Sequence, residues 1–259
     1  MKKLLFVLAM LTPLMSFSQS AFTGTWRFSP QSAQFSGKPI SFSLQNGVYR
    51  CGSCVPKIET QADGKDHERS GSPYSDMISV REVDDHTIEM ITKKAGKVVG
   101  KSTDTVSPDG ETLVTEWSFV SENGQEGHGK STSKRLAPAP AGANKASGSW
   151  QPQKIDSASD TVLTVTFKAT DDGLSMSDLT GDSYDAKFDG KDYPYKGDPG
   201  TTSVSLKKID AHTIEEIDKR QGKVIFISRM TLTPDGQSMN IVNKDVLRDT
   251  TSKFEAKKQ

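Results

Sequence analysis

The chain has 259 residues, with 33 basic and 33 acidic side chains, so its formal net charge is zero. The basic residues form only short clusters such as Lys93-Lys94. This argues against nucleic-acid binding, which needs a concentrated basic surface. Hydrophobic residues make up 33% of the sequence, a low share that suits small β modules with one polar face. The length allows two modules of about 100–120 residues each.

Residues 1–20 have the pattern of a signal peptide. Lys2 and Lys3 precede an apolar run at residues 4–15, and Ser18 and Ser20 are the small residues expected before a cut at Ala21. A cut after Ser18 is the alternative. The run is shorter than the ~20 residues of a membrane span, and no later stretch approaches that length. We therefore expect an exported bacterial protein, periplasmic or extracellular, without a transmembrane segment.

The block from Asp63 to about Glu116 occurs twice. Shifted by 126 positions, it falls without a gap on Asp189 to about Val242, and roughly two in five paired positions are identical. The matched segments are Asp-Gly-Lys-Asp, His-Thr-Ile-Glu, Gly-Lys-Val and Ser/Thr-Pro-Asp-Gly. A gapless match of this length indicates duplication, so the chain contains two copies of one module.

Both copies show the period-two alternation of β-strands with one buried face. The Ser/Thr-Pro-Asp-Gly tetrads lie between such runs, where proline presets φ and glycine accepts a positive φ, which closes a hairpin. The pattern predicts strands near 77–83, 86–93, 97–106 and 111–120, and near 203–209, 212–219, 222–232 and 237–244. Further strands are expected near 39–49, 127–136 and 161–167. We predict an all-β fold of two tandem homologous antiparallel β-meander modules, each a small up-and-down barrel or a curled sheet.

Each copy begins with a Gly-x-Trp, at Gly24-Thr25-Trp26 and at Gly148-Ser149-Trp150. Between the copies lies an Ala/Pro/Gly-rich run that is expected to be a semi-extended linker. The predicted division is a signal peptide at 1–20, the first repeat at 21–136, the linker at 137–147 and the second repeat at 148–259.

Cys51-Gly52-Ser53-Cys54 is the local motif with chemical content, and it occurs only in the first copy. In an exported protein, Cys51 and Cys54 are expected to form a disulfide that locks a turn. A redox pair is an alternative, but a reactive thiolate is usually held at a helix N-terminus, and no helix is evident after Cys54. A metal site with His67 is another, but no fourth ligand lies at the required spacing. We predict no catalytic residue, no metal and no cofactor.

Other polar residues that recur have structural interpretations. His86 and His212 each follow an acidic turn and are interpreted as solvated turn residues, because a catalytic base needs a nucleophile and an orienting acid beside it. The Asp-Gly-Lys-Asp pair and Asp171-Asp172-Gly173 resemble fragments of calcium loops but lack the full ligand series, so hairpin turns are preferred. The three tryptophans are interpreted as core residues: Trp26, Trp117 and Trp150.

A Gly-x-Trp that leads into the first strand of an up-and-down meander resembles the calycins, meaning the lipocalins and their fatty-acid-binding relatives. In that group the tryptophan closes one end of a barrel. The chain departs from lipocalins in lacking a C-terminal helix signal and in having few apolar residues to line a cup. In the first copy, Gly-Thr-Trp, Cys-x-x-Cys, Asp-Gly-Lys-Asp, Gly-Lys-Val-Val and Ser-Pro-Asp-Gly follow one another, an order similar to that in uncharacterised exported bacterial proteins. That second resemblance implies no function.

Three hypotheses follow. The calycin resemblance implies a non-enzymatic binding module for a small apolar or amphipathic ligand. The alternatives are a structural or interaction protein of the cell envelope, and a thiol-disulfide redox protein. The expected partner is accordingly a small lipophilic ligand or an envelope protein. Because the shared residues are mostly turn formers and inward β-branched residues, any activity that distinguishes the copies is expected upstream of Asp63.

Overall fold

Strands dominate the computed structural model, which describes residues 21–170 and 172–259. The predicted signal peptide, residues 1–20, and Asp171 lie outside the described residues. Helical structure is confined to short elements such as α2 (Asp160–Leu163) and the 3-10 turn η1 (Pro30–Ser32). In the part of the chain that the structure describes, no helix is long and apolar enough to span a membrane. The predicted all-β fold class is confirmed.

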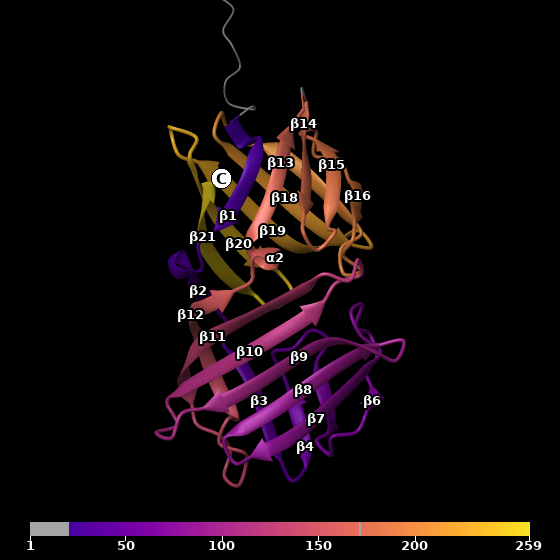
Figure 1. Cartoon of the computed structure of the whole chain (residues 1–259), viewed down its shortest axis with the longest axis vertical. Helices are drawn as coiled ribbons and strands as arrows, with labels where there is room; N and C mark the ends of the chain where they lie inside the picture. The colour runs from indigo at the N-terminus through magenta and orange to yellow at the C-terminus, as the bar shows by residue number, and fades with distance from the viewer. Residues whose placement is uncertain (1–20, 171) are drawn as a thin grey trace, which may run out of the picture.

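The strands form two antiparallel sheets that curl into barrel-like units stacked end to end (Figure 1). Sheet B has ten strands in the order β5-β4-β3-β12-β11-β10-β9-β8-β7-β6. Its strands are β3 (Ile40–Gln45), β4 (Val48–Cys51), β5 (Ile58–Gln61), β6 (His67–Glu68), β7 (Met77–Asp84), β8 (Thr87–Lys94), β9 (Lys97–Val106), β10 (Thr112–Val120), β11 (Glu126–Ala137) and β12 (Gly148–Ala158).

Sheet A has eleven strands in the order β1-β13-β14-β15-β16-β17-β18-β19-β20-β21-β2, and β1 also pairs with β21, which closes the ring. Its strands are β1 (Gly24–Phe28), β2 (Gln34–Gly37), β13 (Thr164–Ala169), β14 (Gly173–Asp178), β15 (Ser183–Lys187), β16 (Tyr193–Lys196), β17 (Ser203–Lys208), β18 (Thr213–Arg220), β19 (Lys223–Leu232), β20 (Ser238–Asp245) and β21 (Thr250–Lys258). Consecutive strands are mostly neighbours, so both sheets are meanders.

The predicted hairpin turns are confirmed, and the two copies build them in the same way. Between β9 and β10, the Asp109 carboxylate accepts a hydrogen bond from the backbone N–H of Glu111 at 3.0 Å. Between β19 and β20, Asp235 accepts the same bond from Gln237 at 3.1 Å. The glycine that follows each aspartate has a positive φ of 79° or 67°, which a residue with a Cβ adopts only at a cost.

The Gly-x-Trp strands cross between the two halves. β1, from the first repeat, lies in sheet A between β13 and β21. β12, which opens the second repeat, lies in sheet B between β11 and β3. Sheet B is therefore built from one continuous stretch, from β3 to β12, while sheet A takes its closing strand from the N-terminal end of the described chain.

The Ala/Pro/Gly-rich run at 137–147 consequently does not separate the two sheets. It connects β11 to β12, which are neighbours within sheet B. Its C-terminal part is packed into that sheet: the buried Asn144 side chain donates hydrogen bonds to the Glu82 carboxylate and the Asp84 carbonyl, at 2.9 and 2.7 Å. The chain passes from one sheet to the other instead at residues 38–39, between β2 and β3, and at residues 159–163, which include α2.

Each Gly-x-Trp tryptophan lies in the core of the sheet that its strand joins. Trp26 and Trp150 are fully buried. Trp26 Nε1 donates to the carbonyl of Phe22 at 2.8 Å, and Trp150 Nε1 to that of Ala146 at 3.0 Å. A cation covers each indole, Lys258 at 5.5 Å and Arg135 at 4.0 Å from the ring centroid. The prediction that Trp26 and Trp150 are core residues is confirmed. It is wrong for Trp117, which is half-buried outside both cores and stacks on Phe119 with ring centroids 6.3 Å apart.

The glycine of each Gly-x-Trp is required by that cation. The backbone φ values of Gly24 and Gly148 are 140° and 138°. A Cβ on Gly24 would overlap the Lys258 side chain, and one on Gly148 would overlap Arg135. Glycine therefore provides the space that lets the cation reach the indole ring.

The two sheets close differently at one place. In sheet A, β15 pairs with β16 through Ser183 with Lys196 and Tyr184 with Tyr195. In sheet B the equivalent strands, β5 and β6, are the two ends of the strand order and do not pair. We call the interval between β5 and β6 the seam. It lies directly after the Cys51–Cys54 motif, in the part of the chain where the copies differ most.

Candidate functional site

The Cys51 and Cys54 sulfurs are bonded to each other, with the two Cα atoms 5.4 Å apart. Cys51 is the last residue of β4 and is buried in the core of sheet B. The strand positions Cys51 rigidly, and the disulfide then holds Cys54, in the turn that follows, against the same core. Residues 52–57, which we call the disulfide loop, lead from there to β5 and contain a cis peptide between Val55 and Pro56.

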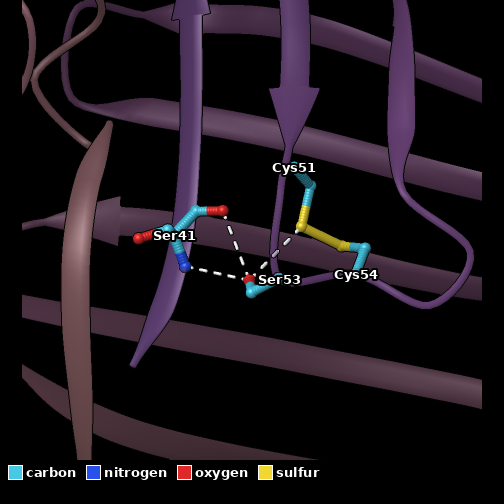
Figure 2. The surroundings of a disulfide bond; sticks show 4 residues. All are labelled: Ser41, Cys51, Ser53 and Cys54. Carbon is cyan, nitrogen blue, oxygen red and sulfur yellow. Dashed lines mark hydrogen bonds between the residues drawn. A yellow bond between two sulfur atoms is a disulfide. The ribbon is translucent and has the colours of Figure 1, made fainter. Parts of the chain in front are cut away.

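Ser53 fixes the disulfide loop to the neighbouring strand (Figure 2). The backbone N–H of Ser41, on β3, donates to the Ser53 hydroxyl at 2.9 Å. The hydroxyl in turn donates to the Ser41 carbonyl at 3.2 Å. These two bonds take the place of a backbone ladder pair at the edge of β3, so the loop is held at both the sulfur and the hydroxyl.

A groove with a volume of about 460 Å³ opens beside the disulfide loop. Three segments line it: the start of β3 with Lys38, Pro39 and Ser41, the disulfide loop, and the pair Leu247 and Arg248 from the turn between β20 and β21. The last pair belongs to sheet A, so the groove lies where the two sheets meet. Its size is within the usual range for small-ligand sites.

The equivalent place in the other half is bridged by a direct contact. There the β10–β11 turn meets the β14–β15 turn: Asn123 Nδ2 donates to the Leu179 carbonyl at 3.3 Å. A Cβ on Gly181 would lie 2.9 Å from the same Asn123 amide nitrogen, so the two turns are in close contact. The β14–β15 turn corresponds to the disulfide loop but has no cysteines. Of these two junctions, the one with the groove is thus also the one with the disulfide.

The groove has a cationic rim over apolar groups. Lys38 and Arg248 are exposed and form ion pairs with Asp249 at 3.4 Å and Asp245 at 2.7 Å. Lys57 has neither an ion pair nor a side-chain hydrogen bond among the described residues. Leu247 is 40% exposed and gives the groove an apolar surface. The arrangement offers positive charge to a ligand whose remaining part is apolar.

The structure gives the cysteine pair no feature of a redox or metal centre. After Cys54 the next regular element is β5, a strand, so this segment provides no helix N-terminus to stabilise a thiolate. His67 lies on β6, with Nε2 2.8 Å from Asp63 Oδ1, in an exposed pair. The His67 hydrogen bond, followed by the hydrogen bond from the Lys65 backbone N–H, lowers the pKa of Asp63 below its usual value.

His86 and His212 occupy turns, as predicted. Each backbone N–H donates to the aspartate two residues before it, Asp84 or Asp210, at 2.8 Å. Ligand-type atoms of Asp84, Asp85 and His86 lie within 4.8 Å of one another. The Asp85 carboxylate, however, is already engaged by Lys145 and by the His86 ring, both at 2.6 Å, and these bonds lower its pKa. This cluster behaves as an ion-paired turn.

The Asp-Gly-Lys-Asp segments are also turns, as predicted. Asp63 and Asp189 each accept a hydrogen bond at 3.0 Å from the backbone N–H of the following lysine, two residues on. The last aspartate of each segment pairs with a lysine of the sheet: Asp66 with Lys93, and Asp192 with Lys219. Their carboxylates are thus used within the fold.

Sheet A holds a buried acidic group that the sequence patterns did not single out. The Tyr184 hydroxyl donates to Glu216 at 2.5 Å inside the sheet. Burial, followed by the Glu216 charge, raises the pKa of Asp218 well above its usual value, and burial raises the pKa of Glu216. The two carboxyl groups therefore hold protons more tightly than exposed carboxyl groups do. Period-two patterning could have found them, since Ile214, Glu216 and Asp218 share one parity.

The family-model comparison finds no match to this chain, and no curated protein matches its sequence. Lys57 lies three residues after Cys54, so the Cys-x-x-Cys motif in the sequence locates this part of the groove. Leu247 and Arg248 come from the opposite end of the chain, and no sequence signal links them to the disulfide loop.

Proposed function

We propose that this chain is a non-enzymatic exported binding protein that takes an amphipathic anion in the groove beside the disulfide loop. The observation that carries the proposal is the combination of Lys38, Lys57 and Arg248 around a groove of about 460 Å³. An anionic group would meet the unpaired Lys57 ammonium, while an apolar body would lie against Leu247 and Pro56. Charge-assisted contacts give orientation, and apolar burial gives most of the affinity.

Of the two junctions described above, only the one at the disulfide loop carries the groove. The groove is therefore not a requirement of the duplicated fold, which agrees with a separate binding role. The Cys51–Cys54 bond is proposed to keep the disulfide loop in its open position, so the disulfide is a structural part of the site. Export of the protein and its residence in the periplasm or medium are part of the same proposal. They rest on the signal-peptide pattern and on the disulfide, which forms in oxidising compartments.

Calorimetric titration of the chain from residue 21 onward with dodecanoate tests the proposal. We expect saturable binding that weakens about tenfold in Lys57→Met, which removes one charge-assisted contact. Lys65→Met is the matched control, because Lys65 is an exposed lysine in a turn outside the groove. Dodecyltrimethylammonium has the same apolar body with a positive head and should not bind. Equal binding of both probes, or binding of neither, would overturn the proposal and favour the alternative of an envelope interaction protein.

A further inference from the structure

The two sheets also meet away from the groove, at a contact between two turns. The β10–β11 turn of sheet B, at residues 121–125, contacts the β14–β15 turn of sheet A, at residues 179–182. The hydrogen bond from Asn123 Nδ2 to the Leu179 carbonyl is 3.3 Å long, against a usual value of about 2.9–3.0 Å. A long bond between two neutral groups contributes little to holding the sheets together. We call this turn–turn contact the acidic contact.

Carboxyl groups from both sheets gather at the acidic contact. Asp182, the last residue of the β14–β15 turn, is half-buried. Burial, followed by the charges of Asp178 and Asp198, raises the pKa of Asp182 to about 7. The charge of Glu122 acts in the same direction, and a hydrogen bond with Tyr195 acts in the opposite one. Glu122 belongs to sheet B, so its part of the effect depends on the two sheets being in contact.

Hydrogen bonds fix the two other carboxylates of sheet A beside Asp182. Asp178 accepts from the backbone N–H groups of Thr180 and Asp182, at 2.9 and 3.0 Å. Asp198 accepts from the backbone N–H of Gly200 at 2.8 Å. These side chains cannot turn away from Asp182 without breaking those bonds, so their negative charge is a fixed part of the contact.

Two cations near the acidic contact are engaged with other groups. Lys94, on β8, pairs with Glu122 at 3.2 Å. Arg220, at the end of β18, donates from Nε to the Gly200 carbonyl at 2.5 Å. A charge on Asp182 is therefore set against carboxylates whose nearby cations already have partners.

Titratable groups also face Asp182 from inside sheet A and from sheet B. On β18, burial, followed by the Glu216 charge, raises the pKa of Asp218, and the Asp182 charge contributes in the same direction. From sheet B, the Tyr74 hydroxyl donates to Asp198 at 3.5 Å, and burial raises the pKa of Tyr74 to about 12. Tyr74 thus stays a neutral donor at neutral pH, while a charge on Asp182 adds to the repulsion among several carboxyl groups.

We propose that the acidic contact is a pH-sensitive latch between the two sheets, closed while Asp182 is protonated and opened when Asp182 ionises opposite Glu122 and the fixed carboxylates of sheet A. A carboxyl group whose pKa is higher in the closed form binds its proton more tightly there than in the open form. Closure is thus favoured at mildly acidic pH, and this advantage is lost as the pH rises from about 4 through about 7. The Asn123–Leu179 hydrogen bond is broken in the open form.

The latch has a consequence for the groove, whose walls also come from both sheets. Opening the latch changes the spacing of Lys57 and Arg248, so ligand binding in the groove should depend on pH, a consequence that rests on the proposed function. The latch itself does not rest on it.

Pulsed electron paramagnetic resonance on the chain from residue 21 onward, without ligand, tests the latch. Spin labels on Ser118→Cys and Ser177→Cys report the distance between β10 and β14, and both serines are exposed. Cys51 and Cys54 are bonded to each other and do not take a label. Between about pH 5 and about pH 8 the ratio of open to closed molecules should rise about tenfold for each unit by which opening lowers the pKa of Asp182.

Three variants separate the latch from other effects of pH. Asp182→Asn removes the titration and should keep the short label distance at every pH. Glu122→Gln removes only the charge that sheet B contributes, and it should reduce the extent of opening. Asp172→Asn is the matched control and should behave like the original chain, because Asp172 is an exposed carboxylate at the opposite end of β14.

A label distance that stays constant with pH in the original chain, or that lengthens equally in Asp182→Asn, would overturn the proposal. Glu122→Gln changes an exposed side chain of the other sheet, so the result does not depend on whether Asp182→Asn folds. Failure of dodecanoate to bind would overturn the proposed function and leave the label distances unaffected, so the two failures can be told apart.

Discussion

The Tyr74 side chain of the first repeat lies directly over Gly200, the residue at its own position in the second repeat. A methyl group at Gly200 would overlap the Tyr74 hydroxyl. That hydroxyl also lies 3.5 Å from the Asp198 carboxylate, which it faces across the junction between the sheets. The equivalent residues of the two copies therefore meet where sheet A joins sheet B, and one must be glycine for the other to be tyrosine.

Gly200→Ala should therefore weaken the junction. We expect a loss of about 1 kcal/mol or less in the free energy of unfolding, because the overlapping atoms are at the far end of the half-exposed Tyr74 side chain, which can move aside. Denaturant titration measures it. Gly52→Ala is the control, since a Cβ there meets no atom within 4 Å. Combining Gly200→Ala with Tyr74→Ala should recover part of the loss, because the overlapping ring is gone. Simple additivity of the two substitutions would contradict the contact.

A circular permutant should fold. The Gln259 backbone N–H donates to the Thr25 carbonyl at 2.9 Å, and Lys258 Nζ lies 3.1 Å from the Ala21 carbonyl. A short linker from Gln259 to Ala21, with new ends between Lys38 and Pro39, makes sheet A continuous in sequence. We expect stability within about 1–2 kcal/mol of the original chain, because such joins at exposed ends are tolerated.

Deleting residues 21–38 without restoring them is the counterpart of that permutant. It removes β1 and the fully buried Trp26, whose loss as a side chain alone costs about 3–5 kcal/mol. Near-ultraviolet circular dichroism should show sheet A losing its fixed packing. If the deleted chain kept the stability of the permutant, β1 would not be the strand that closes sheet A.

Replacing both cysteines should have a modest effect on stability. The double variant Cys51→Ser with Cys54→Ser opens a very short covalent loop, so the chain-entropy model gives a loss below about 2 kcal/mol. Thermal unfolding with and without reductant measures it, and reductant should change only the original chain. The larger expected effect is on dodecanoate binding in the groove. A loss above about 4 kcal/mol would mean that the disulfide supports the whole sheet.

Asp104 should make stability depend on pH in the direction opposite to most carboxylates. Its side chain is half-buried in sheet B, accepts a hydrogen bond from Thr115 at 2.6 Å and has a pKa raised by desolvation to about 6. Between about pH 4 and pH 6 the folded chain keeps this proton while the unfolded chain loses it, so this group lowers stability as pH rises.

Asp104→Asn keeps the Thr115 bond and removes the titration. Relative to the original chain, the variant should gain about 2 kcal/mol between pH 4 and pH 7. Urea titration at several pH values measures the difference. Asp109→Asn is the control with the opposite sign, because turn hydrogen bonds lower the pKa of Asp109 and its contribution is lost as pH falls. A constant difference across this pH range would show that Asp104 is not buried in solution.

The local structure of this protein could be predicted from the sequence because its causes are local. The Ser/Thr-Pro-Asp-Gly and Asp-Gly-Lys-Asp turns depend on a side chain and a backbone two residues apart, and the alternation of apolar residues sets which face of each strand is buried. The recurrence of the block at an offset of 126 positions showed that the same turns and strands occur twice in the chain.

Only the tertiary structure decided which sheet each Gly-x-Trp strand joins and where the candidate sites lie. Trp26 and Trp150 have the same local environment. The local sequence pattern therefore does not show whether a Gly-x-Trp strand joins the sheet of its own repeat or the sheet of the other repeat. That choice depends on the connections between the sheets, at residues 38–39 and 159–163, and on the contacts of the whole junction. The groove depends in the same way on groups far apart in the chain, Lys57 and Arg248, which line one groove only when the two sheets have curled and met.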